Sequence, residues 1–340
     1  MVPRKRGGNG VKARMSDVAR LADVSMITVS RAIRTPDRVA DDTRARVEAA
    51  MRQTGYVPDL VAASLASRRS RVVAVVVPTI GSSIFSDSIK GMADLLRSRG
   101  YQLIIGEGSY STEDSESVIS ALLGRRPDGL ILTGSQHPTR ALRMIKDAGI
   151  PVVEMWELPP RPIDSAVGFN NRAAVRDLAE TLVRTGYRSI AFIGPAQGDR
   201  RAHQRRMGYA DAMARHGRPT VFLETPPPPS LMEHGASAVA RLASAHPEVD
   251  AVCFTSDGLA AGALFECRRL GWDVPGRLAL AGFGDFEIAA AASPALTTVA
   301  IPRYRIGEEA ARVILGRIDG ELVPGQIVDL GFEVVTREST

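Results

Sequence analysis

Cysteine is scarce in this chain. Only two are present among 340 residues, Cys253 and Cys267, which excludes the disulfide framework of small secreted domains. Neither has a second thiol or a histidine at metal-ligand spacing, and no pair of the five histidines stands at i, i+4 with a glutamate. We therefore expect no metal site and no cofactor, and both cysteines as small buried apolar side chains.

Long hydrophobic runs are absent as well. The longest apolar run in the first part of the sequence covers residues 72–78, far below the roughly 18–20 residues that span a bilayer. The N-terminal residues lead into no hydrophobic stretch with a small-residue cleavage site, so we expect a cytoplasmic protein without a secretory signal. A composition of 44% hydrophobic and 24% charged residues is typical of globular proteins and excludes intrinsic disorder.

The charge of the chain is unevenly distributed. Residues 1–71 contain 15 lysines and arginines against 7 acidic residues, whereas the remainder contains 28 against 31. The net charge of +5 thus arises from a short basic segment followed by a long, slightly acidic one. This distribution indicates that a short N-terminal module binds a polyanion and the larger part has another task.

Residues 14–57 carry three short helical patterns. The first has apolar residues at i, i+3, i+4 and i+7 from Met15, and the second follows Ser25, a good N-cap, from Met26 to about Arg34. The third begins near residues 41–42 and stops at Gly55. Three helices with a tight turn between the first two favour a DNA-binding helix-turn-helix, with a purely structural bundle as the alternative.

These residues resemble a known family. Residues 15–33 (MSDVARLADVSMITVSRAI), 43–50 (TRARVEAA) and 55–58 (GYVP) are similar to the headpiece of the lactose-repressor (LacI/GalR) family of transcription regulators, and within it to the gluconate-utilisation repressors. The resemblance implies an all-α helix-turn-helix headpiece and an α/β two-lobed, periplasmic-binding-protein-like effector domain. The corresponding boundaries are a flexible basic tail at 1–13, the headpiece at 14–58, a hinge helix at 59–70 and the effector and dimerisation domain at 71–340.

The second helix carries the candidate specificity residues. Met26, Ile27 and Arg31 point outward, where Arg31 can donate to guanine and the two apolar side chains can contact a thymine methyl. The resemblance implies that the positions of Met26 and Ile27 select the operator. Other side chains are expected to hold phosphates and fix the register, namely Arg14, Thr28, Ser30, Arg34 and Tyr56.

Within the linker, residues 59–67 are compatible with a helix, but about nine residues are too few for a helix that is stable alone in water. The resemblance implies that it folds when two copies pack over the minor groove, with Leu65 as the apolar wedge. Arg68 suits the flanking phosphates, although a solvated linker would also be basic. Asp59 stands where the family usually has asparagine, so we expect somewhat weaker hinge docking.

Beyond residue 71 short apolar runs alternate with helical patterns, as buried parallel strands do in βαβ units. Two series of such runs predict two doubly wound lobes with a ligand cleft at the carboxyl ends of their strands. The resemblance places the crossings between lobes near residues 168–169, 297–299 and 326–330. The predicted strands are 72–78, 101–105, 129–133 and 151–155 in the first lobe, and 189–194, 250–255 and 278–283 in the second.

Several side chains follow these strands and are candidates for effector binding. Arg205 matches the family arginine that grips the effector, and a guanidinium can bind a carboxylate bidentately. Gly284 stands where sugar-binding members carry an aspartate, and the loss of that carboxylate favours an anionic effector. For the remaining candidates, lobe packing or a solvated loop is an equal alternative: His137, Trp156, Ser256, Asp257 and Asp285, with Phe85, Glu154, Phe169 and Asn170 as weaker candidates.

The sequence thus predicts a dimeric, ligand-responsive repressor of a pseudo-palindromic operator, released by a sugar acid such as gluconate. The alternative is corepression, in which the same coupling makes the effector strengthen operator binding instead of weakening it. A solute-binding protein is disfavoured by the missing export signal. A sugar-acid enzyme is disfavoured because no G-x-S-x-G elbow is present and residues 282–287 depart from G-x-G-x-x-G.

Overall fold

The computed structural model describes residues 13–57, 69–81, 83–109, 112–195, 200–226 and 232–340. They divide into two units, one within Met1–Ser70 and one within Arg71–Thr340. Among these described residues, none of the helices has both the length and the apolar character required to cross a membrane.

The first unit is a three-helix headpiece. Helix α1 (Met15–Ala22) ends where Asp23 turns into the left-handed region, and α2 (Met26–Arg34) begins at Ser25, whose hydroxyl accepts from the Thr28 amide at 3.1 Å. Helix α3 (Asp41–Thr54) ends at Gly55 with φ +64°. The predicted helices are therefore confirmed. Their shared core consists of Val18, Ala19, Ala22, Val29, Val47 and Ala50.

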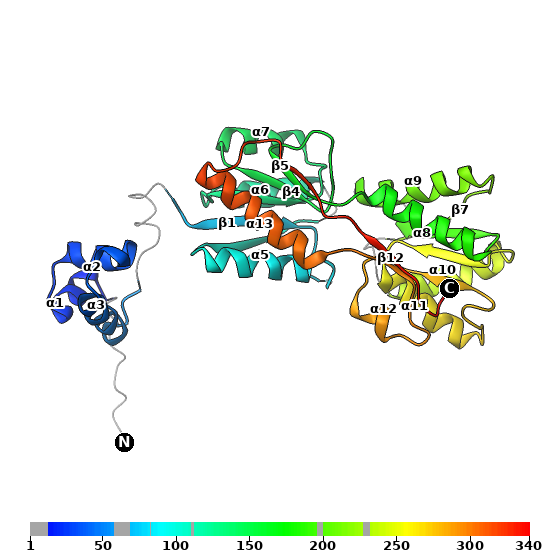
Figure 1. The fold of residues 1–340 in the computed structure, drawn as a ribbon, viewed down its shortest axis with the longest axis horizontal. Coiled ribbons are helices and arrows are strands. Elements are labelled where there is room, and N and C mark those ends of the chain that lie inside the picture. The colour runs from blue at the N-terminus through cyan, green and yellow to red at the C-terminus, as the bar shows by residue number, and fades with distance from the viewer. Residues whose placement is uncertain (1–12, 58–68, 82, 110–111, 196–199, 227–231) are drawn as a thin grey trace, which may run out of the picture. The chain divides into compact units, whose positions relative to one another are not determined.

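The first lobe of the second unit is built on a six-stranded parallel sheet in the order β11-β5-β4-β3-β1-β2. Successive residues of β1 face opposite sides, so Val73 and Val75 belong to the core shared with α5 and α13, while Ala74 and Val76 belong to the core shared with α6 and α7. Figure 1 shows these four helices around the sheet of this lobe. The strands are β1 (Val72–Val77), β2 (Gln102–Glu107), β3 (Gly129–Thr133), β4 (Val152–Met155), β5 (Ser165–Gly168) and β11 (Ile327–Asp329). The helices are α5 (Ser86–Ser98), α6 (Thr112–Leu123), α7 (Thr139–Ala148) and α13 (Arg303–Asp319), and a 3-10 turn covers Ser83–Phe85.

The second lobe has a four-stranded parallel sheet in the order β7-β6-β8-β9. Its two faces are covered by the pairs α8·α9 and α10·α11. The strands are β6 (Ile190–Pro195), β7 (Val221–Thr225), β8 (Ala251–Phe254) and β9 (Ala279–Ala281), with an antiparallel pair β10 (Thr298–Ala300) and β12 (Glu333–Val335). The helices are α8 (Asn171–Thr185), α9 (Arg200–Arg215), α10 (Met232–Ala245), α11 (Asp257–Arg269) and α12 (Glu287–Ala291).

The structure differs from the sequence expectation mainly in short strands. Strands β5, β7, β10, β11 and β12 were not predicted, because each is brief and gains its stability from its neighbours in the sheet. The first crossing between lobes lies at residues 169–170, as expected. The second lies at residues 301–302, because the β10·β12 ladder keeps the chain in the second lobe to Ala300, and the third lies at residues 330–332, because β11 pairs with β5 of the first lobe to Asp329.

Both sheets reverse their strand order once. In the first lobe the chain runs from β1 to the edge strand β2 and then crosses back over β1 to β3, and in the second lobe it runs from β6 to the edge strand β7 and then crosses back over β6 to β8. In open α/β sheets, ligands bind outside the carboxyl ends of the strands at such a reversal. The segments that follow β1 and β3 in the first lobe, and β6 and β8 in the second, lie at these reversals, and those after β4, β5 and β9 lie at the same ends of the two sheets.

Glycines let three helix pairs approach very closely. A Cβ on Gly208 of α9 would lie 2.1 Å from the Arg172 carbonyl oxygen, and one on Gly307 of α13 would lie 1.8 Å from the Ser88 carbonyl oxygen. The same holds for Gly262 of α11 against α10. Because these obstacles are backbone atoms, a side chain at any of the three positions forces the helices apart.

We expect Gly208→Ala to lower the free energy of unfolding of the second unit by about 1–3 kcal/mol, the usual penalty of overpacking. Urea unfolding followed by circular dichroism measures it. Gly124→Ala is the matched control, since a Cβ there meets its nearest atoms at an ordinary 3.5 Å. Equal stability of the two variants would contradict this account of helix packing.

Candidate functional site

The guanidinium of Arg205 lies at the junction between the two lobes. Arg205 is on α9, and its Nε donates to Asn171 Oδ1 at 2.9 Å while Nη1 donates to the Thr255 carbonyl oxygen at 3.0 Å. Its guanidinium carbon lies 3.7 Å from the centre of the Phe283 ring. Two acceptors and an aromatic face thus fix the plane of this cation at the carboxyl ends of β8 and β9.

Asn171 connects this arginine to the first lobe. The residue is buried at the start of α8, and its Nδ2 donates to the Trp156 carbonyl oxygen at 2.9 Å while its Oδ1 accepts from Arg205. The neighbouring residue, Asn170, was the effector-binding candidate predicted from the sequence. Its side chain caps α8 by accepting from the Ala173 amide at 3.0 Å. Both asparagines follow the same strand, and only the helix register decides which of them turns toward Arg205.

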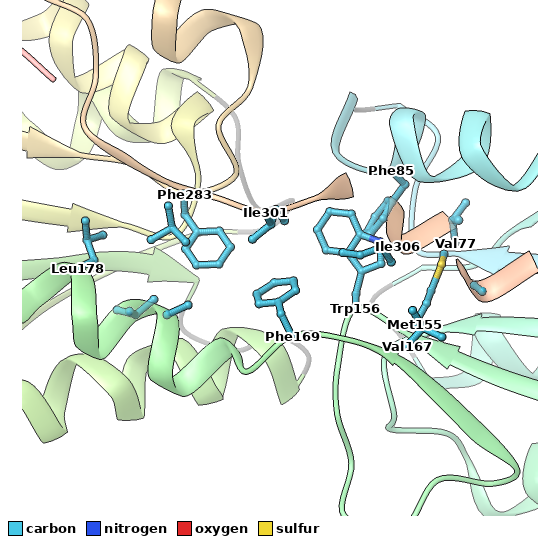
Figure 2. Close-up of a cluster of buried hydrophobic side chains, with 14 of the residues drawn as sticks. Val77, Phe85, Met155, Trp156, Val167, Phe169, Leu178, Phe283, Ile301 and Ile306 are labelled. Carbon is cyan, nitrogen blue, oxygen red and sulfur yellow. The ribbon is translucent and has the colours of Figure 1, made fainter. Parts of the chain in front are cut away.

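An aromatic row crosses the junction. Figure 2 shows Phe169 between Phe283 of the second lobe and Trp156 of the first, with ring centroids 6.1 and 6.4 Å apart. Phe85 continues the row with its centroid 5.0 Å from Trp156. Trp156 is 2% exposed, and its Nε1 donates to the Ser88 hydroxyl at 3.2 Å. The structure therefore brings together the predicted Phe85, Trp156 and Phe169 as one packed wall.

A buried carboxylate that sequence reasoning missed lies beside this wall. Glu157 follows Trp156, and its Oε2 accepts from the Ser135 hydroxyl at 2.6 Å while Oε1 lies 3.8 Å from Arg200 Nε of α9. The next residue of α9, Arg201, is buried with its guanidinium carbon 5.4 Å from the Phe85 ring centre. The signal in the sequence was the position of Glu157 directly after a predicted strand.

Three other effector-binding candidates make hydrogen bonds within the second lobe. Ser256 caps α11 by accepting from the Leu259 amide at 3.3 Å, and Asp285 accepts from Arg337 at 2.7 Å. Asp257 is fully buried and accepts from the Thr298 hydroxyl at 2.6 Å and the Phe286 amide at 2.7 Å. Burial raises the pKa of Asp257 to about 6, because desolvation outweighs these two hydrogen bonds.

The space beside Gly284 is occupied by an aromatic ring. Gly284 has φ +123°, and a Cβ there would lie 2.3 Å from the Phe286 ring. Arg303, at the start of α13, lies over this ring at 4.3 Å, donates to the Gly284 carbonyl oxygen and pairs with Asp87 at 2.8 Å. A carboxylate cannot enter this position unless Phe286 moves.

His137 is buried beside Glu154 and is not a solvated loop side chain. Its Nε2 lies 3.3 Å from Glu154 Oε1, outside hydrogen-bond geometry, and both side chains are buried. Glu154 also accepts from the Ile163 amide at 2.8 Å. The structure thus groups His137 with Glu154 and the loop after β4, while Arg205 is grouped with Asn171 and Phe283.

The headpiece presents an apolar pair on α2. Met26 and Ile27 are 55% and 66% exposed, and Arg31 is exposed one turn further along. Ser30 is partly exposed, whereas the Thr28 hydroxyl shares a hydrogen bond with Ser25 at 2.9 Å. Arg14 is exposed before α1, and Tyr56 packs partly buried on the helical core. The Arg34 side chain, Leu65 and Arg68 lie outside the described residues.

Comparison with known proteins gives consistent results. The model of the bacterial regulatory proteins, lacI family, matches residues 14–59, and that of a periplasmic binding protein-like domain matches residues 179–340. The HTH-type transcriptional regulator GntR of Pseudomonas aeruginosa is 39% identical over 328 residues, which cover 96% of this chain and 95% of that protein. GntR of Escherichia coli (strain K12) is 35% identical over 320 residues, 94% and 96% of the two chains.

Solved structures agree with the described fold. A LacI family regulator from Silicibacter pomeroyi superposes with a TM-score of 0.87 at 32% identity, over 96% of this chain and 99% of that one. The lac repressor dimer bound to operator and the anti-inducer ONPF gives 0.84 at 22% identity, over 97% and 99%, which supports the fold alone. The chain belongs to the LacI family of DNA-binding transcriptional regulators.

Proposed function

We propose that this regulator is a repressor that binds a pseudo-palindromic operator as a dimer and is released by a sugar acid such as gluconate. The observation that carries the proposal is the Arg205 guanidinium, oriented at the interlobe junction by Asn171, Thr255 and Phe283. A cation fixed in this way is suited to a carboxylate. The relatives named GntR and the missing carboxylate at Gly284 support the same choice.

On the DNA side, Met26 and Ile27 are the proposed determinants of operator choice. Met26 and Ile27 are adjacent large apolar side chains, each more than half exposed, and such an exposed apolar surface suits a partner that covers it. In a major groove that partner is a base edge such as a thymine methyl. Arg14, Thr28, Ser30, Arg31, Arg34 and Tyr56 are the proposed supporting contacts, with Leu65 and Arg68 acting in the hinge segment at 59–70.

Coupling between effector and operator is proposed to act through lobe closure. The effector carboxylate on Arg205 draws the second lobe toward the first, and the paired hinge segments of the dimer lose their mutual packing. Phe85, Trp156 and Phe169 form the apolar wall of the proposed site, with Asn170 at its edge. Ser256, Asp257 and Asp285 shape the second-lobe side, and His137 acts through Glu154.

Joint replacement of Met26 by Thr and Ile27 by Gln is expected to change which operator is bound, because base-edge contacts carry sequence preference. The slope of affinity against salt concentration should stay the same, since no phosphate contact is removed. Gel shifts over a set of operator variants measure both quantities. Leu21→Gln, an apolar-to-polar change on exposed α1, is the control. Uniform weakening on every operator would contradict the assignment.

Arg205→Ala is expected to weaken gluconate binding about 100-fold while operator binding persists, because a carboxylate loses its charge-assisted partner. Isothermal titration and a gel shift with added gluconate measure the two effects. Arg206→Ala is the matched control, since the Arg206 guanidinium lies over Phe222 on the outer side of α9. Undiminished gluconate binding by the Arg205 variant would refute the proposed carboxylate site.

A further inference from the structure

Glu157 is a carboxylate of the first lobe that meets the arginine-rich start of α9. Its side chain is 5% exposed, and its Oε1 lies 3.8 Å from Arg200 Nε. Arg200 and Arg205 both belong to α9. The acid of the first lobe thus pairs with the same helix that carries the oriented cation of the second.

The backbone around Glu157 fixes the direction of this carboxylate. Trp156 has φ +73°, a conformation rarely adopted by a large side chain. Gly168 of β5 allows the turn, because a Cβ there would lie 2.6 Å from the Glu157 amide nitrogen. The Ser135 hydroxyl then holds Oε2 at 2.6 Å. Glu157 consequently has little freedom to turn away from an approaching ligand.

The Trp156 carbonyl oxygen also ties Glu157 to Arg205. This oxygen accepts from Asn171 Nδ2, and Asn171 Oδ1 accepts from Arg205. Because the Trp156 carbonyl is bonded directly to the Glu157 amide, the anion and the cation are held on one continuous framework.

We infer that Glu157 is a specificity-determining residue that selects sugar acids with a single carboxylate. This inference rests on the proposed function of Arg205. The carboxylate of the ligand binds Arg205, and the hydroxyl groups at its far end donate to Glu157. A carboxylate at that far end instead meets a buried charge of the same sign, which is strongly unfavourable. The site thereby accepts aldonates and rejects aldarates, the corresponding diacids.

The test uses D-gluconate and D-glucarate, which share one carbon skeleton and differ in the second carboxylate. Isothermal titration of the full chain near neutral pH should show that gluconate binds at least about tenfold more tightly than glucarate. In Glu157→Gln, gluconate should bind about tenfold more weakly and glucarate more tightly, so that the preference disappears. Ser135→Ala should reduce the preference in the same direction and to a smaller extent.

Glu180→Gln is the matched control, since Glu180 pairs with Arg215 at the far end of α9 at 3.0 Å. Operator binding in a gel shift verifies that each variant is folded. If the wild-type protein binds gluconate and its ratio of gluconate to glucarate affinity equals that of Glu157→Gln, the role of Glu157 is overturned and the proposed function stays in place. A wild-type protein that binds neither acid would overturn both.

Discussion

The second unit depends on one buried hydrogen-bond bridge, in which Asn171 accepts from Arg205 and donates to the Trp156 carbonyl. An amide group is suited to this place because it offers an acceptor and a donor on opposite atoms. The acceptor orients a cation of the second lobe, and the donor satisfies a backbone oxygen of the first. Loss of either contact leaves a buried polar group without its partner, a cost comparable to the contact itself. The bridge therefore makes the position of Arg205 sensitive to the relation of the lobes.

The surrounding packing restricts where movement can occur. Helices α8 and α9, and likewise α5 and α13, touch backbone to backbone at glycines, so each lobe resists internal deformation. Flexibility is left to the three connections between the lobes. Arg303 stands beside one of them, paired with Asp87 and lying over Phe286 of the second lobe. A ligand that changes the relation of the lobes must act on such contacts and on the aromatic row at the junction, rather than on the core within each lobe.

Sequence patterns predicted the headpiece well because its helices are set by local signals. The Ser25 cap and the stop at Gly55 are properties of single residues and their neighbours. The long buried strands were equally clear, since each is a continuous apolar run. The short strands β5, β7 and β10 to β12 were missed because pairing, and not local preference, stabilises them. At the candidate site, Arg205 and the aromatic row came from sequence, whereas Asn171 and Glu157 needed the register of α8 and the bend at Trp156.

The charges at the junction bear on the proposed choice of ligand. The resemblance to the lactose-repressor family implies a carboxylate at the position of Gly284 in sugar-binding members, on the same lobe as Arg205. Here Phe286 fills that space, and Glu157 places a buried acid in the first lobe. Arg205 and Glu157 therefore belong to different lobes. In the proposed binding mode, a ligand with a negative end and a hydroxyl end has a single orientation between them. Bound in that way it contacts both lobes at once, so the same charges that choose the ligand also favour the closed arrangement.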